Sequence, residues 1–319
     1  MRRATVLLFA LLLMAVAAGT AYAIFSKQRT VPSNAFTTAA DWSPPTTSSS
    51  VIAKTVGYTP GYIKQGGTYY VYANVTDVGN PPVGISTVTT NVSTITTGST
   101  AVSLVSGSYS VGGVSYNYRS ASITANVLLS AATYTYSITA TDAGSRSATT
   151  NTWSVVVDNT VPTASDIQTT NGGPIAGRAD IGDTITFTFS EPIEPNSILA
   201  GWTGASTSVV VRVNQVITND TVTIFNAANT TQLPLGTVDL GRTDYVTTNR
   251  TFGASGTAST MVMSGNSITF TLGTQSGAAT TAASTGTMAW TPSATATDRA
   301  GNAETATVRT ETGTADKEF

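Results

Sequence analysis

Hydrophobic and polar residues alternate with a period of two along much of the chain beyond residue 50. This alternation predicts β-strands that bury one face and expose the other. The stretch 68–77 shows it most clearly, because Tyr69, Val71, Ala73 and Val75 fall on one face. No helical periodicity interrupts the first part of this pattern, so the expected fold class is all-β.

The expected strands form two blocks, residues 51–160 and 161–319, separated internally by turns rich in Gly, Asn and Pro. In the second block, Ile185, Phe187 and Phe189 are expected to face the core. Its extra length falls in loop-like stretches at 226–256 and 273–286. The expected strands are 68–77, 85–92, 100–106, 114–118, 122–128, 133–141 and 152–158, then 182–192, 208–214, 221–226, 259–263, 267–272, 287–290 and 305–309.

The N-terminal region differs from both blocks. Arg2 and Arg3 precede a long uncharged apolar run that ends in the small-residue sequence Ala21-Tyr22-Ala23. This order is typical of a secretory signal peptide, and the run is also long enough for a retained membrane anchor. We therefore expect residues 1–29 to be a signal peptide or membrane anchor. Residues 30–50 are rich in Pro, Ser and Thr and are expected to be a linker.

Composition limits the chemistry that is open to the protein. The chain has no Cys and no His, only 10% charged residues and a net charge of −2. Without Cys, stability must come from buried apolar faces and not from disulfides. Without His, hydrolase and zinc sites that depend on imidazole are excluded. The mildly acidic balance argues against nucleic acid as a partner.

A strand signature near the end of the first block carries a family resemblance. The stretch 132–142 reads ATYTYSITATD, with Tyr134 and Tyr136 on the same face as Ile138 and Ala140. It resembles the penultimate strand of bacterial immunoglobulin-like (Ig-like), PKD-like and cadherin-like surface modules. The resemblance implies two tandem Ig-like β-sandwich domains after an N-terminal signal or anchor helix. It also implies that Tyr134 or Tyr136 closes a tyrosine corner.

The second block supports two modules of related topology. Residues 138–144 read ITATDAG and residues 294–302 read ATATDRAGN, each about one strand before the end of its block. The stretch 153–162, WSVVVDNTVP, resembles the junctions of tandem bacterial Ig-like proteins, and Pro162 stiffens the start of the second block.

The processed N-terminus carries a second resemblance. Residues 19–26, GTAYAIFS, and residues 34–42, NAFTTAADW, resemble the start of the TasA/camelysin group of bacterial surface and biofilm-matrix proteins. The likeness implies a bacterial source and secretion. It also suggests that the segment 25–42 adds as a strand to the sheet edge of a neighbouring copy.

The acidic residues gather at expected turns, and three of them are candidate calcium ligands. Asp77, Asp142 and Asp158 follow strands of the first block, and their oxygens would suit Ca²⁺ if they met at one end of it. The alternative is that each Asp caps its turn by accepting nearby backbone N–H groups. Glu191 and Glu194 are a carboxylate pair that an enzyme acting on glycans would need, although Pro192 and Pro195 favour an exposed loop.

Tyrosine is concentrated in the first block, at positions 69, 70, 72, 109, 116 and 118. A sheet face lined with Tyr suits contact with carbohydrate or protein, and cross-strand pairing within the sheet is the alternative.

The sequence therefore predicts a non-enzymatic extracellular or cell-surface structural or adhesion protein. Its expected partners are an extracellular protein, a glycan or further copies of itself, with membrane contact only through an uncleaved N-terminal segment. A biofilm-matrix or fibre subunit and a glycan-processing enzyme are the alternatives, and no cofactor is expected apart from Ca²⁺.

Overall fold

The computed structural model describes residues 41–54, 57–79 and 81–319. The expected signal or anchor at 1–29, the linker up to residue 40 and all but the last two residues of the segment 25–42 lie outside these ranges. Within the described ranges, no helix combines the length and hydrophobicity needed to cross a membrane.

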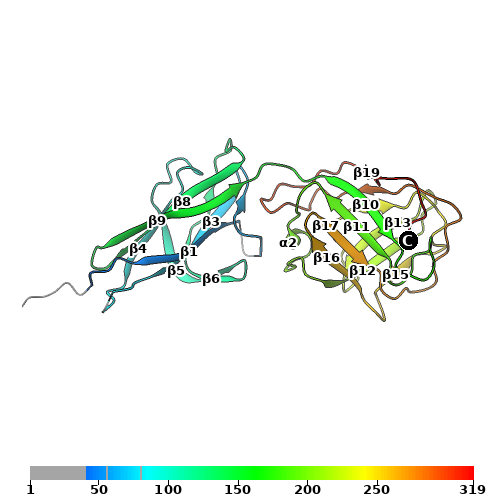
Figure 1. Ribbon diagram of the computed structural model, residues 1–319, viewed down its shortest axis with the longest axis horizontal. Helices are drawn as coiled ribbons and strands as arrows, with labels where there is room; N and C mark the ends of the chain where they lie inside the picture. The colour runs from blue at the N-terminus through cyan, green and yellow to red at the C-terminus, as the bar shows by residue number, and fades with distance from the viewer. Residues whose placement is uncertain (1–40, 55–56, 80) are drawn as a thin grey trace, which may run out of the picture. The chain divides into compact units, whose positions relative to one another are not determined.

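The described chain is all-β and contains two β-sheet domains, as the alternation predicts. Each domain is one sheet that curls into a nearly closed, barrel-like form. Figure 1 labels most of the strands of each domain.

The first domain contains nine strands in the spatial order β1-β3-β6-β5-β4-β8-β9-β2, with β7 paired to β3. Its pairs are antiparallel except β2 with β9. The strands are β1 (Thr46–Ala53), β2 (Tyr62–Ile63), β3 (Thr68–Thr76), β4 (Ile85–Asn91), β5 (Val102–Val111), β6 (Val114–Ser120), β7 (Ile123–Thr124), β8 (Ala132–Asp142) and β9 (Ser147–Val157).

One strand, β5, connects two groups of strands into a continuous sheet. The first group is β1, β3 and β6, and the second is β4, β8, β9 and β2. The first residues of β5 pair with β4, as Thr90 faces Val102, and its remainder pairs with β6, as Val111 faces Val114. The two ends of the path also approach each other, because the carbonyl oxygen of Ile52 on β1 accepts the N–H of Gly61, the residue before β2, at 2.7 Å. Ser50 Oγ of β1 also lies 3.0 Å from the hydroxyl of Tyr136 on β8.

The core of the first domain lies between these two groups of strands. Tyr69, Val71, Ala73 and Val75 are all buried in it, which confirms the face assigned from the alternation. Tyr134, one of the two candidates for a tyrosine corner, donates from its hydroxyl to the backbone oxygen of Ser130 at 3.1 Å. Tyr136 instead pairs with Ser50, so the two tyrosines of the signature have different roles.

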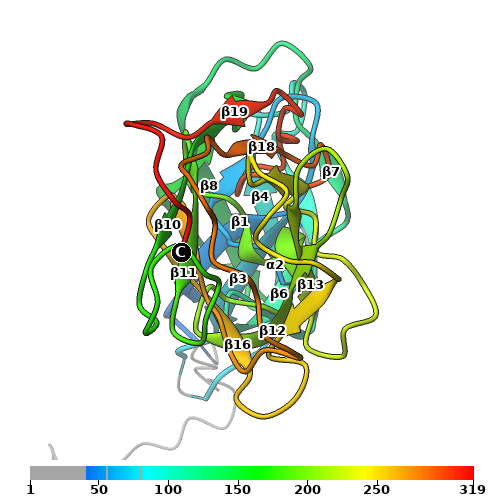
Figure 2. The same ribbon diagram turned by 90° about the vertical axis from the view of Figure 1, so that its right-hand side faces the viewer.

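The second domain contains ten strands in the order β10-β11-β17-β16-β12-β13-β14-β18-β19, with β15 paired to β12. Figure 2 looks onto this domain. The elements are β10 (Ala164–Thr170), β11 (Thr184–Phe189), α2 (Pro195–Ile198), β12 (Thr207–Asn214), β13 (Thr221–Asn226), β14 (Thr237–Asp239), β15 (Arg250–Phe252), β16 (Ser259–Ser264), β17 (Ser267–Thr271), β18 (Ala289–Thr291) and β19 (Arg309–Thr310).

Aromatic side chains occupy the centre of the second core. Trp290 is fully buried and meets Phe187 and Phe189 edge-on, with ring centroids 4.9 and 5.1 Å away. Ile185 is buried in the same cluster, so the face predicted for this strand is confirmed. The edge-to-face geometry adds to the stabilisation that burial of the rings provides.

Several expected boundaries differ from the structure: the strands expected at 100–106 and 152–158 are longer, and those expected at 182–192 and 305–309 are shorter. Two further cases show the physical reason. β1 begins at Thr46, inside the predicted linker, because Thr46–Ala53 pairs along β3 and gains ladder hydrogen bonds that its composition did not signal. The expected strand 122–128 shortens to Ile123–Thr124, because Asn126 begins a turn in which Leu129 N donates to its carbonyl oxygen. Pairing with β3 decided the first of these boundaries, and a local turn decided the second.

Candidate functional site

Two of the three predicted calcium ligands lie at the same end of the first domain. The Asp77 carboxylate accepts the N–H groups of Gly79 at 3.2 Å and Gly84 at 2.6 Å. The Asp142 carboxylate, on a residue only 1% exposed, accepts the N–H of Arg146 at 2.8 Å. The two turns are tied together, because the carbonyl oxygen of Gly84 accepts the N–H of Ala143. Both residues therefore hold turns, as the capping alternative proposed.

Asp158 lies at the opposite end of the domain. Asp142 ends β8 and Asp158 follows the last residue of β9, and these two strands form a hairpin of 11 residues on each side. At ~3.3 Å per residue, the hairpin separates the two carboxylates by roughly 30 Å. The structure therefore does not bring Asp77, Asp142 and Asp158 together, because an antiparallel hairpin places the residues at its turn and at its open end far apart.

Asp158 instead joins two acidic residues of the second domain. One carboxylate oxygen each from Asp158, Glu191 and Asp298 lies within 4.8 Å of the others. Asp158 follows β9, Glu191 follows β11, and Asp298 lies in the turn of the ATATDRAGN sequence. The backbone oxygen of Asp158 also accepts Nδ2 of Asn302, which fixes the position of that turn. We name these three residues the joint cluster.

Each member of the joint cluster has a different set of partners. Asp298 is 1% exposed, and its carboxylate accepts the N–H groups of Gly301 and Asn302 and the amide of Asn302. Asp158 accepts the N–H of Thr160 at 2.9 Å. Glu191 has one buried carboxylate oxygen with no hydrogen-bond partner among the described residues. Glu191 is thus the least satisfied of the three carboxylates.

Electrostatics reflect this crowding. Burial, followed by the negative charges of Asp158 and Asp298, raises the pKa of Glu191 to about 7. A proton shared with Asp158 or a cation would relieve the repulsion between the carboxylates. An arrangement of this kind can hold a proton or a hard cation through oxygen atoms.

Two lysines of the first domain approach the same turn. Lys64 Nζ donates to the backbone oxygen of Gly301 at 2.7 Å. Burial and the nearby charge of Lys64 lower the pKa of Lys54, while Asp298 and Glu194 partly offset that effect. A Cβ at Gly301 would collide with the Lys54 side chain, and Gly301 also has a positive φ of 93°. The turn therefore requires glycine at this position.

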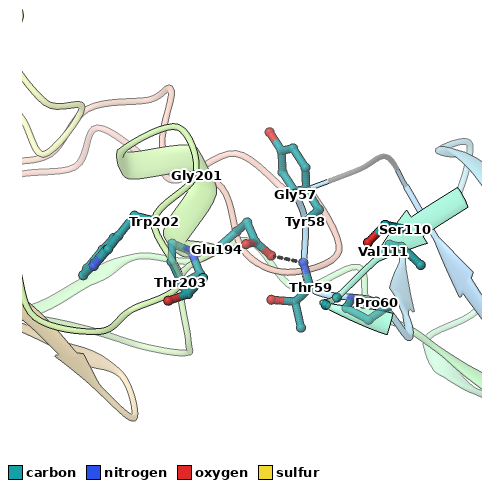
Figure 3. A pocket seen from close by; sticks show the side chains of 13 residues that line it. Gly57, Tyr58, Thr59, Pro60, Ser110, Val111, Glu194, Gly201, Trp202 and Thr203 are labelled. Atoms are coloured by element: carbon teal, nitrogen blue, oxygen red, sulfur yellow. Dashed lines mark hydrogen bonds between the residues drawn. The ribbon is translucent and has the colours of Figure 1, made fainter. Parts of the chain in front are cut away.

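Glu194 has a structural role beside a cavity of about 410 Å³. Its Oε2 accepts the N–H of Thr59 at 2.9 Å, and its Oε1 accepts the N–H of Asn196 at the start of α2. Figure 3 shows Glu194 bonded to Thr59, with Trp202 and Val111 among the other lining residues. Both oxygens of this residue, which is 2% exposed, are thus engaged by backbone groups.

The two glutamates of the proposed catalytic pair therefore belong to different environments. Glu191 lies in the joint cluster, and Glu194 caps α2 and accepts Thr59. The contribution of Asp298 was not recognised in the sequence as a partner of Asp158. The sequence repeat that aligns Asp298 with Asp142 did identify the turn that contains Asp298. It could not show which residues contact that turn.

Comparison with known proteins does not extend this description: no protein-family model, no curated protein and no solved structure matches the chain.

Proposed function

We propose that this protein is a non-enzymatic extracellular or cell-surface structural or adhesion protein built from two Ig-like β-sandwich modules. The observation that carries the proposal is the use of acidic side chains. In several turns, an Asp carboxylate accepts backbone N–H groups and so fixes the loop. The chain has no Cys that could fix these loops by disulfides. Such bonds stabilise architecture, and they occupy the oxygen atoms that acid–base chemistry would need free.

Two buried Asp residues of the second domain show this structural role most clearly. Asp183 is fully buried and accepts the N–H groups of Gly172, Gly173 and Asp180. Asp220 is also fully buried, and one of its oxygens accepts the N–H groups of two consecutive residues, 245 and 246. A charged acceptor that serves several buried donors contributes more than a neutral hydrogen bond. Asp183 closes the loop of its own neighbourhood, and Asp220 holds together segments 25 residues apart.

The Ig-like assignment is supported by the first domain. Tyr134 makes the hydroxyl-to-backbone bond of a tyrosine corner on the strand whose sequence resembles such modules. Outward-facing threonines also pair across strands, as in Thr139 with Thr149 and Thr186 with Thr269, both with oxygen atoms close enough to bond. Cross-strand hydroxyl pairs stabilise a sheet face that contains few charges.

An aromatic face on β3, β5 and β6 is the contact surface that we favour for a protein or glycan partner. Arg119 lies 5.0 Å from the ring centre of Tyr70 and 4.5 Å from that of Tyr109. Tyr72 and Tyr116 are buried beneath this layer and serve the packing of the sheet. Tyr70 and Tyr109 remain partly exposed, and flat rings ordered by a guanidinium suit sugar or protein contact.

The test compares binding of the full chain with that of variants. Purified protein would be screened against glycans and extracellular proteins, with Tyr70→Ala/Tyr109→Ala as the test variant and Thr133→Ala, on an exposed residue of β8, as the control. We expect binding to one ligand class, weakened about tenfold or more in the double variant and unchanged in the control. Hydrolysis of a glycan that disappears in Glu191→Gln would overturn the proposal in favour of an enzyme.

A further inference from the structure

A second group of acidic residues lies wholly within the second domain. One carboxylate oxygen each from Glu311, Asp316 and Glu318 lies within 4.8 Å of the others. Glu311 is half-buried, Asp316 is exposed and Glu318 is 1% exposed. We name these residues the seam cluster, because they follow β19 at the place where it approaches β10.

Hydrogen bonds on every side hold the seam cluster in position. The N–H of Glu311 donates to Met288 and extends the pairing of β18 with β19, and the backbone oxygen of Asp316 accepts the N–H of Gly286. The N–H of Glu318 donates to the hydroxyl of Tyr245 at 2.7 Å. The three acidic residues are thus presented from backbone that the sheet and its loops already fix.

The next residue anchors the same segment in the core. Phe319 is 2% exposed, and its ring meets that of Tyr245 edge-on at 5.9 Å. Its N–H donates to Oγ1 of Thr169, on β10, and its carbonyl oxygen accepts the N–H of Gly177. The last residues therefore run beside β10, as Figure 2 shows.

Glu318 has an unpartnered oxygen atom despite this close packing. Its Oε2 accepts the hydroxyl of Thr169 at 2.6 Å, whereas its Oε1 is buried with no hydrogen-bond partner in the described part of the chain. Oε1 of Glu311 is buried without a partner in the same way. An unpaired buried carboxylate oxygen is costly, so two in one cluster call for either a proton shared between Glu311 and Glu318 or a bound cation.

The described chain supplies no ion pair to this cluster. Its two salt bridges join Arg178 to Asp180 and Arg242 to Asp244. Burial and the charge of Glu311 raise the pKa of Glu318 to about 8, which expresses the same lack of positive charge. Asp166 adds a further negative charge near Glu311.

We propose that Glu311, Asp316 and Glu318 bind a calcium ion. Carboxylate oxygens are the only ionisable donors of the cluster, and hard cations with six to eight oxygen ligands prefer such sites. The exposed Asp316 leaves a side open through which water completes the coordination. Nothing in this proposal depends on the proposed adhesive function.

Calcium at this position would lock the closure of the second domain. Asp166 on β10 accepts both the N–H and the hydroxyl of Thr312, and Gln168 Nε2 donates to the Thr312 oxygen at 2.8 Å. The seam cluster flanks this contact on the segment that follows β19. An ion held there would therefore resist separation of β10 from β19.

The test is a calcium titration of the full chain, followed by calorimetry and by thermal unfolding at one fixed pH. Calcium-free wild-type protein should bind Ca²⁺ and unfold at a higher temperature when 1–5 mM Ca²⁺ is added, with a weaker response to Mg²⁺. The double variant Glu311→Gln/Glu318→Gln should lose the seam ion. It should also lose the part of the increase in unfolding temperature that this ion causes. Gln preserves the size of each side chain and removes the charge, and an unchanged circular dichroism spectrum shows that the variant folds.

The matched control is Glu191→Gln, which makes the same change in the joint cluster. It should keep the seam ion, so its second-domain transition should still respond to calcium. No calcium binding by the wild type, an equal response to Mg²⁺, or an undiminished calcium response in the double variant would each overturn the proposal.

Discussion

The two β-domains reach stability by different means. The first is built on long hairpins, such as β8 and β9 with 11 residues each, and its loops are short. The second has shorter strands, a larger core and long loops, and buried Asp residues hold those loops. Asp183 and Asp220 are fully buried and each accepts three backbone N–H groups, whereas the buried Asp142 of the first domain accepts one.

This difference shows how a chain without Cys can retain long loops. In the first domain, Asp77 and Asp142 also accept backbone N–H groups, but the turn of Asp142 joins two strands of 11 residues that are already paired. In the second, a loop has few ladder partners, and one buried carboxylate that accepts two or three N–H groups replaces them. The stability of the second domain should therefore depend on individual residues more strongly than that of the first.

The largest expected effect is in the aromatic core of the second domain. Trp290→Ala would remove a fully buried ring and its bond from Nε1 to the Leu235 oxygen. We expect a loss of about 3–5 kcal/mol in the unfolding free energy of this domain alone, measured by denaturant titration. Trp42→Ala is the control, since Trp42 is 74% exposed and should change stability by less than about 0.5 kcal/mol. An equal loss in both domains would show that they unfold together.

The next effect tests the role of buried carboxylates. Asp183→Ala would leave the N–H groups of Gly172, Gly173 and Asp180 without their acceptor. We expect a loss of about 2–4 kcal/mol in the unfolding free energy of the second domain. Asp77→Ala should have a much smaller effect on the first domain, because water can replace an exposed acceptor. Similar losses from the two variants would remove the distinction between the domains.

Replacement of Glu304 by Gln is expected to increase the unfolding free energy of the second domain, by less than the losses above. This residue is 2% exposed, both its carboxylate oxygens lack hydrogen-bond partners among the described residues, and burial raises its pKa from 4.5 to about 8. The folded state therefore holds a proton that the unfolded state releases, so stability should fall as pH rises from about 4.5 to about 8. At pH 8, Glu304→Gln should stabilise the second domain by on the order of 1–3 kcal/mol, and at pH 4.5 the difference should nearly vanish.

The measurement is thermal unfolding of wild type and Glu304→Gln across that pH range. Tyr134→Phe, in the first domain, serves as a variant with no charge change and should show no such pH dependence. A constant difference between Glu304→Gln and wild type at all pH values would show that the carboxyl does not titrate in the folded protein.

The smallest expected effect is that of the tyrosine corner. Tyr134→Phe would remove the 3.1 Å bond to the Ser130 oxygen and keep the ring. Because neighbouring ladder bonds already hold this part of the hairpin, we expect a loss of about 0.5–1 kcal/mol in the first domain, measured by denaturant titration. A loss above about 2 kcal/mol would mean that the first domain also depends on single side-chain bonds.

Strand positions were the most predictable part of the fold. The expected strands at 68–77, 85–92 and 221–226 match β3, β4 and β13 within one residue at either end. They were readable because burial on one face imposes an alternation that few other structures produce. Short strands such as β14 and β15 were missed, since three residues carry too little alternation to stand out from the surrounding loop.

The candidate sites were less predictable. Asp158 was recognised from the sequence, but its partners Glu191 and Asp298 come from turns that follow other strands. The seam cluster was not recognised, because Glu311, Asp316 and Glu318 look like a short charged tail in the sequence. This segment packs against the second domain because β19 pairs with β18 and because Phe319 is buried.

The sequence by itself determined that the described chain is all-β, that it forms two domains, and which faces of its main strands are buried. These properties follow from local periodicity and from the apolar area that each strand must remove from water. Tertiary structure alone decided how each sheet closes and which carboxylates meet. Such meetings depend on register and on long-range pairing, because residues more than a hundred positions apart become neighbours only when the sheets have formed.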